Sequence, residues 1–143
     1  MMEDLSLHVL DIAENSIEAN AHRVAIRVEE CPSRDLLILE ITDDGRGMSP
    51  RLLASALDPF VTTKVERQIG LGLSLLAQAA QATGGKVTLR SRPDRGTRVR
   101  ATFRLSHIDL QPLGDMAETL TVLMVSHPDV HFRYAHKTDA GSY

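Results

Sequence analysis

The chain is poor in aromatic residues and almost free of cysteine. Its 143 residues include no Trp, two Tyr and three Phe, and Cys31 is the single cysteine, which excludes an intrachain disulfide. No apolar run approaches the roughly 20 residues of a membrane span, and the acidic start of the chain lacks the basic segment of a signal peptide. We therefore expect a cytoplasmic protein without a membrane contact, built as one domain around an aliphatic core.

Charge and histidine content argue against two further classes of protein. The formal net charge is -3, which gives no reason to expect a nucleic acid partner. The six His residues are scattered along the chain, and with one Cys they form no cluster that has the spacing of zinc ligands. Neither a nucleic acid interface nor a structural zinc site is predicted.

The spacing of the apolar residues predicts three helices and two β-hairpins before residue 106. In chain order the expected elements are a helix (5–20), a hairpin (24–28 and 36–42), a helix (49–57), a loop (58–69), a helix (72–83) and a hairpin (86–92 and 97–105). Asn20 occupies the place of a left-handed C-cap, and Ser49-Pro50 is typical of a helix start. This order predicts an α+β fold, a two-layer sandwich with helices on one face of a mixed, mainly antiparallel sheet.

The second hairpin alternates between apolar and basic residues. One face carries Val87, Leu89, Val99, Ala101, Phe103 and Leu105. The other face carries Lys86, Arg90, Arg92, Arg98, Arg100 and Arg104. The basic face is either solvated or a docking surface for an acidic partner.

Residues 107–143 carry weaker signals than the rest of the chain. Gly114-Asp115 predicts the start of a helix that runs through Met124, and residues 131–136 predict a strand. We expect this segment to be an extension without an assigned role, packed on the domain formed by residues 1–106.

Asp11 and Asn15 are four residues apart, and so lie one turn apart on one face of the first helix. An Asn side-chain oxygen is a ligand that suits Mg²⁺, and a carboxylate one turn away can deprotonate a water that attacks a γ-phosphate. The alternative is an ordinary solvated helix face. His8, on the same helix, is expected at its polar edge.

Asp43 follows three apolar residues on one face of the second strand. Its carboxylate is therefore expected to point inward, where a charge is costly unless it meets a donor such as an adenine amino group. Gly45 and Gly47 allow the next backbone segment to turn sharply beside a ring. The alternative is an Asp-Gly turn in which Asp43 bonds to its own loop.

Gly70-Leu71-Gly72-Leu73 is expected to open the third helix. Unpaired backbone N–H groups at a helix start attract phosphate, and Lys64 would add a positive charge. The alternative is a pair of loop glycines before an Ala-rich core helix.

Taken in order, these motifs resemble the ATP-binding domain shared by DNA gyrase B, Hsp90, histidine kinases and MutL, the GHKL superfamily with its Bergerat fold. The resemblance spans about residues 5–105. It rests on an N box (11–21, DIAENSIEANA), an adenine-binding D-x-G-x-G motif (43–47), a lid (59–64) and glycine box (70–73) similar to nitrogen-regulation-type histidine kinases, and a late Gly-Thr pair (96–97).

The resemblance implies that ATP and Mg²⁺ are the cofactors. It implies Asn15 as the magnesium ligand and Asp11 as the general base, although Asp11 is one methylene shorter than the usual Glu. The residues implied to contact the nucleotide are Asp43, Gly45, Gly47, Met48, Lys64, Gly70, Leu71, Gly72, Leu73 and Thr97. The lid departs from the kinase pattern because Gln68 replaces its first glycine.

Three functions agree with this resemblance. The first is a stand-alone Mg–ATP-binding protein that hydrolyses ATP slowly or transfers its γ-phosphate to a protein partner. The second is a non-catalytic ATP-sensing module that regulates a larger complex. The third is a detached kinase domain that phosphorylates a His on another chain. A homodimer is left open in each case.

Overall fold

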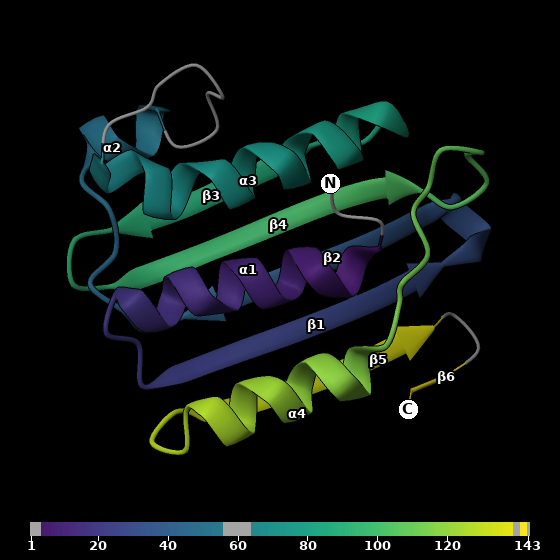
Figure 1. Ribbon diagram of the computed structural model, residues 1–143. Helices are drawn as coiled ribbons and strands as arrows, with labels where there is room; N and C mark the ends of the chain where they lie inside the picture. The colour runs from purple at the N-terminus through teal and green to yellow at the C-terminus, as the bar shows by residue number, and fades with distance from the viewer. Residues whose placement is uncertain (1–3, 56–63, 139–140, 143) are drawn as a thin grey trace.

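The computed structural model describes residues 4–55, 64–138 and 141–142, and these residues form two layers (Figure 1). One layer is a mixed six-stranded sheet with the strand order β3-β4-β2-β1-β5-β6. The other consists of helices that lie on a single face of this sheet. The expected α+β sandwich is confirmed, and the opposite face of the sheet carries no helix among the described residues.

Two antiparallel hairpins build the centre of the sheet. β1 (Arg23–Cys31) pairs with β2 (Leu36–Asp43), and β3 (Val87–Arg92) pairs with β4 (Gly96–Arg104). The hairpins join because β2 also pairs antiparallel with β4, in a register that sets Asp43 opposite Thr97. Two residues that lie far apart in the sequence therefore meet at one end of the sheet.

Three of the helices cover this sheet from one side (Figure 1). They are α1 (Leu5–Glu18), α3 (Lys64–Ala82) and α4 (Met116–Ser126); the short α2 (Pro50–Ser55) follows the loop after β2. Asp4 and Asp115 cap α1 and α4 by accepting the backbone N–H groups of Leu7 and Glu118. The core between the layers includes Val9, Ile12, Ile26, Ile41, Leu76, Phe103 and Leu123, each no more than 3% exposed.

The segment after residue 106 packs on the same sheet. β5 (His131–Thr138) pairs parallel with β1, which makes the sheet mixed, and β6 (Gly141–Ser142) pairs with β5. The backbone N–H groups of Leu5 and Ser6 donate to the carbonyls of Pro112 and Leu113, each at 2.9 Å. This segment and the start of α1 therefore stabilise one another.

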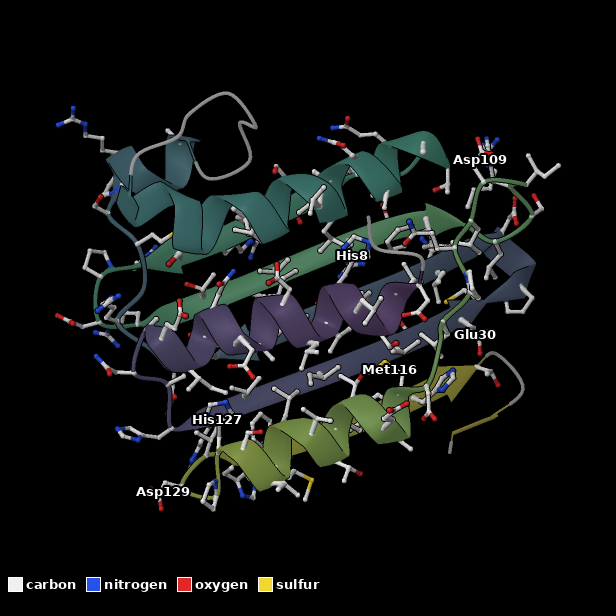
Figure 2. The ribbon with its side chains drawn as sticks, viewed as in Figure 1. His8, Glu30, Asp109, Met116, His127 and Asp129 are labelled. Atoms are coloured by element: carbon white, nitrogen blue, oxygen red, sulfur yellow. The ribbon has the colours of Figure 1, made fainter. Side chains whose placement is uncertain are left out.

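Two expectations about helices are corrected. The third helix begins at Lys64, so Gly70 and Gly72 lie inside α3 and do not open it. Residues 64–69 of the expected loop are helical, and the rest of that loop, with the end of the second helix, lies outside the described residues. His8 (labelled in Figure 2) is not at a polar edge. It is 2% exposed, and its Nε2 is 3.1 Å from Oε1 of Gln111.

Candidate functional site

A cavity of about 340 Å³ opens at the end of the sheet where Asp43 and Thr97 meet. Its walls come from α1, the loop after β2, α3 and β4. The apolar part of the wall consists of Ile12, Ala19, Met48, Leu73 and Val99. The polar part consists of Asn15, Ser16, Asp43, Arg46 and Thr97, with Gly47 beside them. A mostly apolar cleft with a few converging polar groups is the usual form of a small-molecule site.

Asp43 is the acidic residue of this wall. Its Oδ2 accepts a hydrogen bond from Oγ of Ser16 (2.7 Å), and its Oδ1 accepts one from the backbone N–H of Gly45 (2.8 Å). Burial raises the pKa of Asp43, and the bonds from Ser16, Gly45 and Thr97 oppose that rise without cancelling it. The carboxylate is thus costly to ionise, and a further donor on a ligand would relieve part of that cost.

Gly45 and Gly47 are required by protein contacts as well as by the turn. A Cβ at Gly45 would lie 2.8 Å from the carbonyl oxygen of Ala19, where the N–H of Arg46 bonds at 2.9 Å. Gly47 has a φ of 69°, and a Cβ there would overlap the carbonyl oxygen of Arg92. The two glycines bring the loop after β2 against α1 and β3, which shapes one side of the cavity.

A serine on β3 ties this loop to Thr97. Oγ of Ser91 accepts from the N–H of Met48 (2.7 Å) and donates to the carbonyl of Gly96 (2.9 Å). The hydroxyl of Ser91 has one proton, and it donates this proton to the carbonyl of Gly96. The hydroxyl of Thr97, whose Oγ1 is 2.9 Å from Oγ of Ser91, is therefore the donor in the bond between the two. Thr97 therefore keeps acceptor capacity toward the cavity.

Asn15 and Asp11 differ in their relation to the cavity. Asn15 lines it, whereas Asp11, one turn earlier on α1, is not among the described residues of the wall. Asp11 is half-buried, and burial raises its pKa; nearby His8 lowers it and Glu14 raises it further. The two residues do share one helix, but the structure brings only Asn15 into the cleft.

Some of the other expected site residues line the cavity and some do not. Met48, Leu73, Gly47 and Thr97 line the cavity together with Asp43. Gly45 is not among the described residues of the wall, and its backbone N–H donates to Asp43. Lys64, Gly70, Leu71 and Gly72 lie along α3, where the structure describes the backbone alone.

Sequence reasoning missed Ser16, Arg46 and Ser91 as site residues. Ser16 and Arg46 had no signal beyond their places next to Asn15 and Gly45 in the chain. Ser91 had a weak one: the predicted hairpin places its strand beside that of Thr97, and the observed register makes the two residues direct partners. Cross-strand Ser–Thr pairs commonly share a hydrogen bond.

Comparison with protein families identifies this architecture. A sequence model of the family described as "Histidine kinase-, DNA gyrase B-, and HSP90-like ATPase" matches residues 3–107. The chain belongs to this family, and the matched residues form an ATP-binding domain of histidine-kinase-like ATPase type. The resemblance drawn from the motifs is confirmed.

The curated relatives are kinases that are much longer than this chain. Sensor protein kinase FleS of Pseudomonas aeruginosa is 40% identical over 110 residues, which cover 77% of this chain and 27% of FleS. Sporulation kinase D of Bacillus subtilis is 30% identical over 98 residues, 68% of this chain and 19% of the kinase. The chain therefore spans about a quarter of these relatives or less.

Solved structures share the fold at low sequence identity. The Aquifex aeolicus MutL ATPase domain complexed with ADP has a TM-score of 0.64 at 15% identity, covering 99% of this chain and 62% of that one. The catalytic domain of histidine kinase ThkA has a TM-score of 0.51 at 22% identity, covering 68% and 64%. In the described part of the chain, no helix has the length and apolar character required to cross a membrane.

Proposed function

We propose that the cavity binds Mg–ATP, with the adenine amino group donating to Asp43 and the triphosphate extending along α1 past Asn15. The observation that carries this proposal is the buried carboxylate of Asp43, held by protein donors at the base of a mostly apolar cleft. Adenine offers an amino donor at the position where guanine has a carbonyl acceptor. The site is therefore expected to prefer ATP over GTP.

The donor set in the cleft fits magnesium. Asn15 presents a hard, uncharged oxygen donor in the cavity wall, and the described residues contain no group of three or more acidic, His or Cys side chains that would hold a metal alone. Mg²⁺ commonly binds through one protein ligand, substrate phosphates and waters. We expect Asn15 to hold the ion and the nucleotide phosphates to complete its ligands.

A second part of the proposal is that the protein turns over the bound ATP. Asp11 would act as the base that takes the proton of a water or of a Ser hydroxyl on a protein partner, or the γ-phosphate would pass to a His of another chain. Its raised pKa suits a base more than that of an exposed Asp does. The similarity to FleS, a sensor protein kinase, supports phosphoryl transfer.

A non-catalytic ATP sensor is the second candidate. It is favoured by the position of Asp11, which is not in the described wall of the cavity while Asn15, one turn later, is. In that case ATP binding alone would change the conformation of a surface that a partner protein binds.

Titration of the protein with ATP by calorimetry tests the binding proposal. We expect saturable binding that is tighter with Mg²⁺ than without it, and weaker binding of GTP. Asn15→Ala is expected to remove the gain from Mg²⁺ and to leave metal-free binding nearly unchanged, while the exposed Gln81→Ala on α3 serves as the control. A magnesium effect that persists in Asn15→Ala would remove Asn15 as the ligand.

Ser16→Ala is expected to make ATP binding more sensitive to acid. The bond from Ser16 lowers the pKa of Asp43, so its loss raises that pKa further. Since the adenine amino group needs an unprotonated acceptor, ATP affinity falls as pH drops through the pKa of Asp43, and this fall should occur at higher pH in the variant. ATP affinity measured across the mildly acidic range checks this, and identical pH profiles for variant and wild type would contradict it.

A further inference from the structure

The hairpin of β3 and β4 carries two adjoining hollows with several basic residues in their walls. The first, about 550 Å³, is lined by Arg90, Arg92, Arg95 and Arg98, and the rest of its wall consists of Thr42, Asp43, Leu89, Ser91, Gly96 and Thr97. The second, about 440 Å³, shares Arg90 and Arg98 and adds Arg34, Lys86 and Arg100. We call the two together the arginine groove. It runs along β3 and β4, whose basic residues alternate with the buried Val87, Val99, Ala101 and Phe103.

The cations of the groove are largely without counter-charges. Glu40 is 2.9 Å from Arg98 and 3.8 Å from Arg100. The other five basic residues of the groove have no ion pair with any described residue. Asp43 touches the first hollow, but its carboxylate oxygens bond to Ser16 and Gly45 on the helix side. A strongly positive strip therefore lies on a protein whose net charge is -3.

The register of the hairpin increases the repulsion within this strip. Arg90 and Arg98 are direct cross-strand partners, and like charges in such a pair destabilise a sheet. A solvated sheet face alone does not require this arrangement, because any polar residue would serve there. An anionic ligand in the groove would be attracted by both arginines and would offset their mutual repulsion.

We propose that the arginine groove docks an acidic segment of a protein partner. Glu40 illustrates the chemistry, because Arg98 and Arg100 already hold one carboxylate between them. The two hollows lie end to end along the hairpin and share the Arg90–Arg98 pair, which suits an extended chain that carries several carboxylates.

Nucleic acid fits the groove less well. The isoelectric point is near 6.0, whereas nucleic acid-binding domains are usually basic throughout. Neither hollow is lined by an aromatic residue on which a base could stack. The acidic residues elsewhere on the protein would repel a long polyanion more than a short acidic segment.

Fluorescence anisotropy with a labelled oligo-glutamate peptide tests the proposal, in low salt and without nucleotide, so that the outcome does not depend on ATP binding. We expect saturable binding that salt weakens. The double variant Arg90→Gln/Arg92→Gln should bind roughly tenfold more weakly, because two exposed charge contacts are removed. Its thermal stability should not fall, because the Arg90–Arg98 repulsion is relieved.

The control is Arg51→Gln/Lys137→Gln, which makes the same change in net charge at exposed positions outside the groove. We expect it to bind the peptide nearly as wild type does. Equal losses in the two double variants, or no binding by the wild type, would overturn the groove as a site. An oligothymidylate that binds more tightly than the peptide, and is lost in the groove variant, would overturn the choice of an acidic protein segment.

Discussion

Asp43→Asn is expected to weaken ATP binding by about 100-fold, since a hydrogen bond to a buried charged acceptor is lost and the amide group of Asn can present a donor to the adenine amino group. The same variant should be as stable as the wild type or slightly more stable without nucleotide. A loss of ATP binding without a loss of stability would show that Asp43 serves ligand binding and not folding. Calorimetry with ATP and thermal unfolding of the nucleotide-free protein measure the two effects.

The stability effect follows from the direction of the pKa shift. The folded protein raises the pKa of Asp43, chiefly by burial, so the ionised form is less favourable in the folded state than in the unfolded chain. This costs stability as pH rises from the unfolded pKa to the raised one, and the cost persists at neutral pH. The uncharged amide in Asp43→Asn would carry no such cost. That amide can also donate to Ser16, whose hydroxyl lies 3.3 Å from the carbonyl of Ile12 and can donate there.

Asp44→Asn is the matched control, one residue along the chain. Burial raises the pKa of Asp44, but the N–H groups of Arg23 and His22, at 2.9 and 2.7 Å, contribute to a larger opposing effect, and the net pKa is lowered. Its ionised form therefore stabilises the fold at neutral pH, and neutralising it should lower the melting temperature while ATP affinity stays unchanged. If Asp43→Asn retained wild-type ATP affinity, or lost as much stability as Asp44→Asn, the role assigned to Asp43 would be wrong.

The inward orientation of Asp43 was predictable because strand periodicity is local. Leu37, Leu39 and Ile41 alternate along β2 and are all at most 5% exposed, and Asp43 continues the same face into the cavity. The turn chemistry at Asn20 and the N-cap at Asp115 were predictable for the same reason. Each of these features depends on residues within a few positions.

The position of the glycine box was not predictable by this reasoning. Gly70 and Gly72 cost only about 1 kcal/mol each inside a helix, relative to Ala. Flanking residues of high helix propensity offset that cost, and Leu73, Leu76 and Ala80 bury the C-terminal half of α3 in the core. The helix therefore runs through both glycines from Lys64, so in this conformation the glycine N–H groups do not form a helix start.

The pairing of strands that are distant in the sequence was the other feature that could not be predicted. The strand near residue 131 was expected, but nothing local indicated that it would lie parallel to β1 at the side opposite β2. The burial of His8 depends on that outcome, because Gln111 and the carbonyls of Pro112 and Leu113 reach α1 only when the C-terminal segment packs there.

Asp11→Asn decides between turnover and sensing. If Asp11 is the base, we expect the variant to release phosphate from Mg–ATP some 10²–10⁴-fold more slowly, the usual contribution of a general base. Its ATP affinity should change little, because Asp11 does not line the described wall of the cavity. It should also stay folded, because burial raises the pKa of Asp11 and its ionised form contributes no net stability at neutral pH.

Glu14→Gln is the control, since Glu14 lies on the same helix and its Oε2 is 3.1 Å from Nε2 of His127, a residue labelled in Figure 2. At pH values well above the pKa of Asp11, the turnover of this variant should match that of the wild type, although removal of the Glu14 charge lowers that pKa somewhat. The wild-type rate should rise with pH through the raised pKa of Asp11, and this rise should vanish in Asp11→Asn. Phosphate release that survives in Asp11→Asn would exclude Asp11 as the base. Saturable ATP binding by the wild type, with neither phosphate release nor transfer to a co-purified protein, would favour the sensor, in which Asn15 and Asp43 bind the nucleotide and Asp11 takes no chemical part.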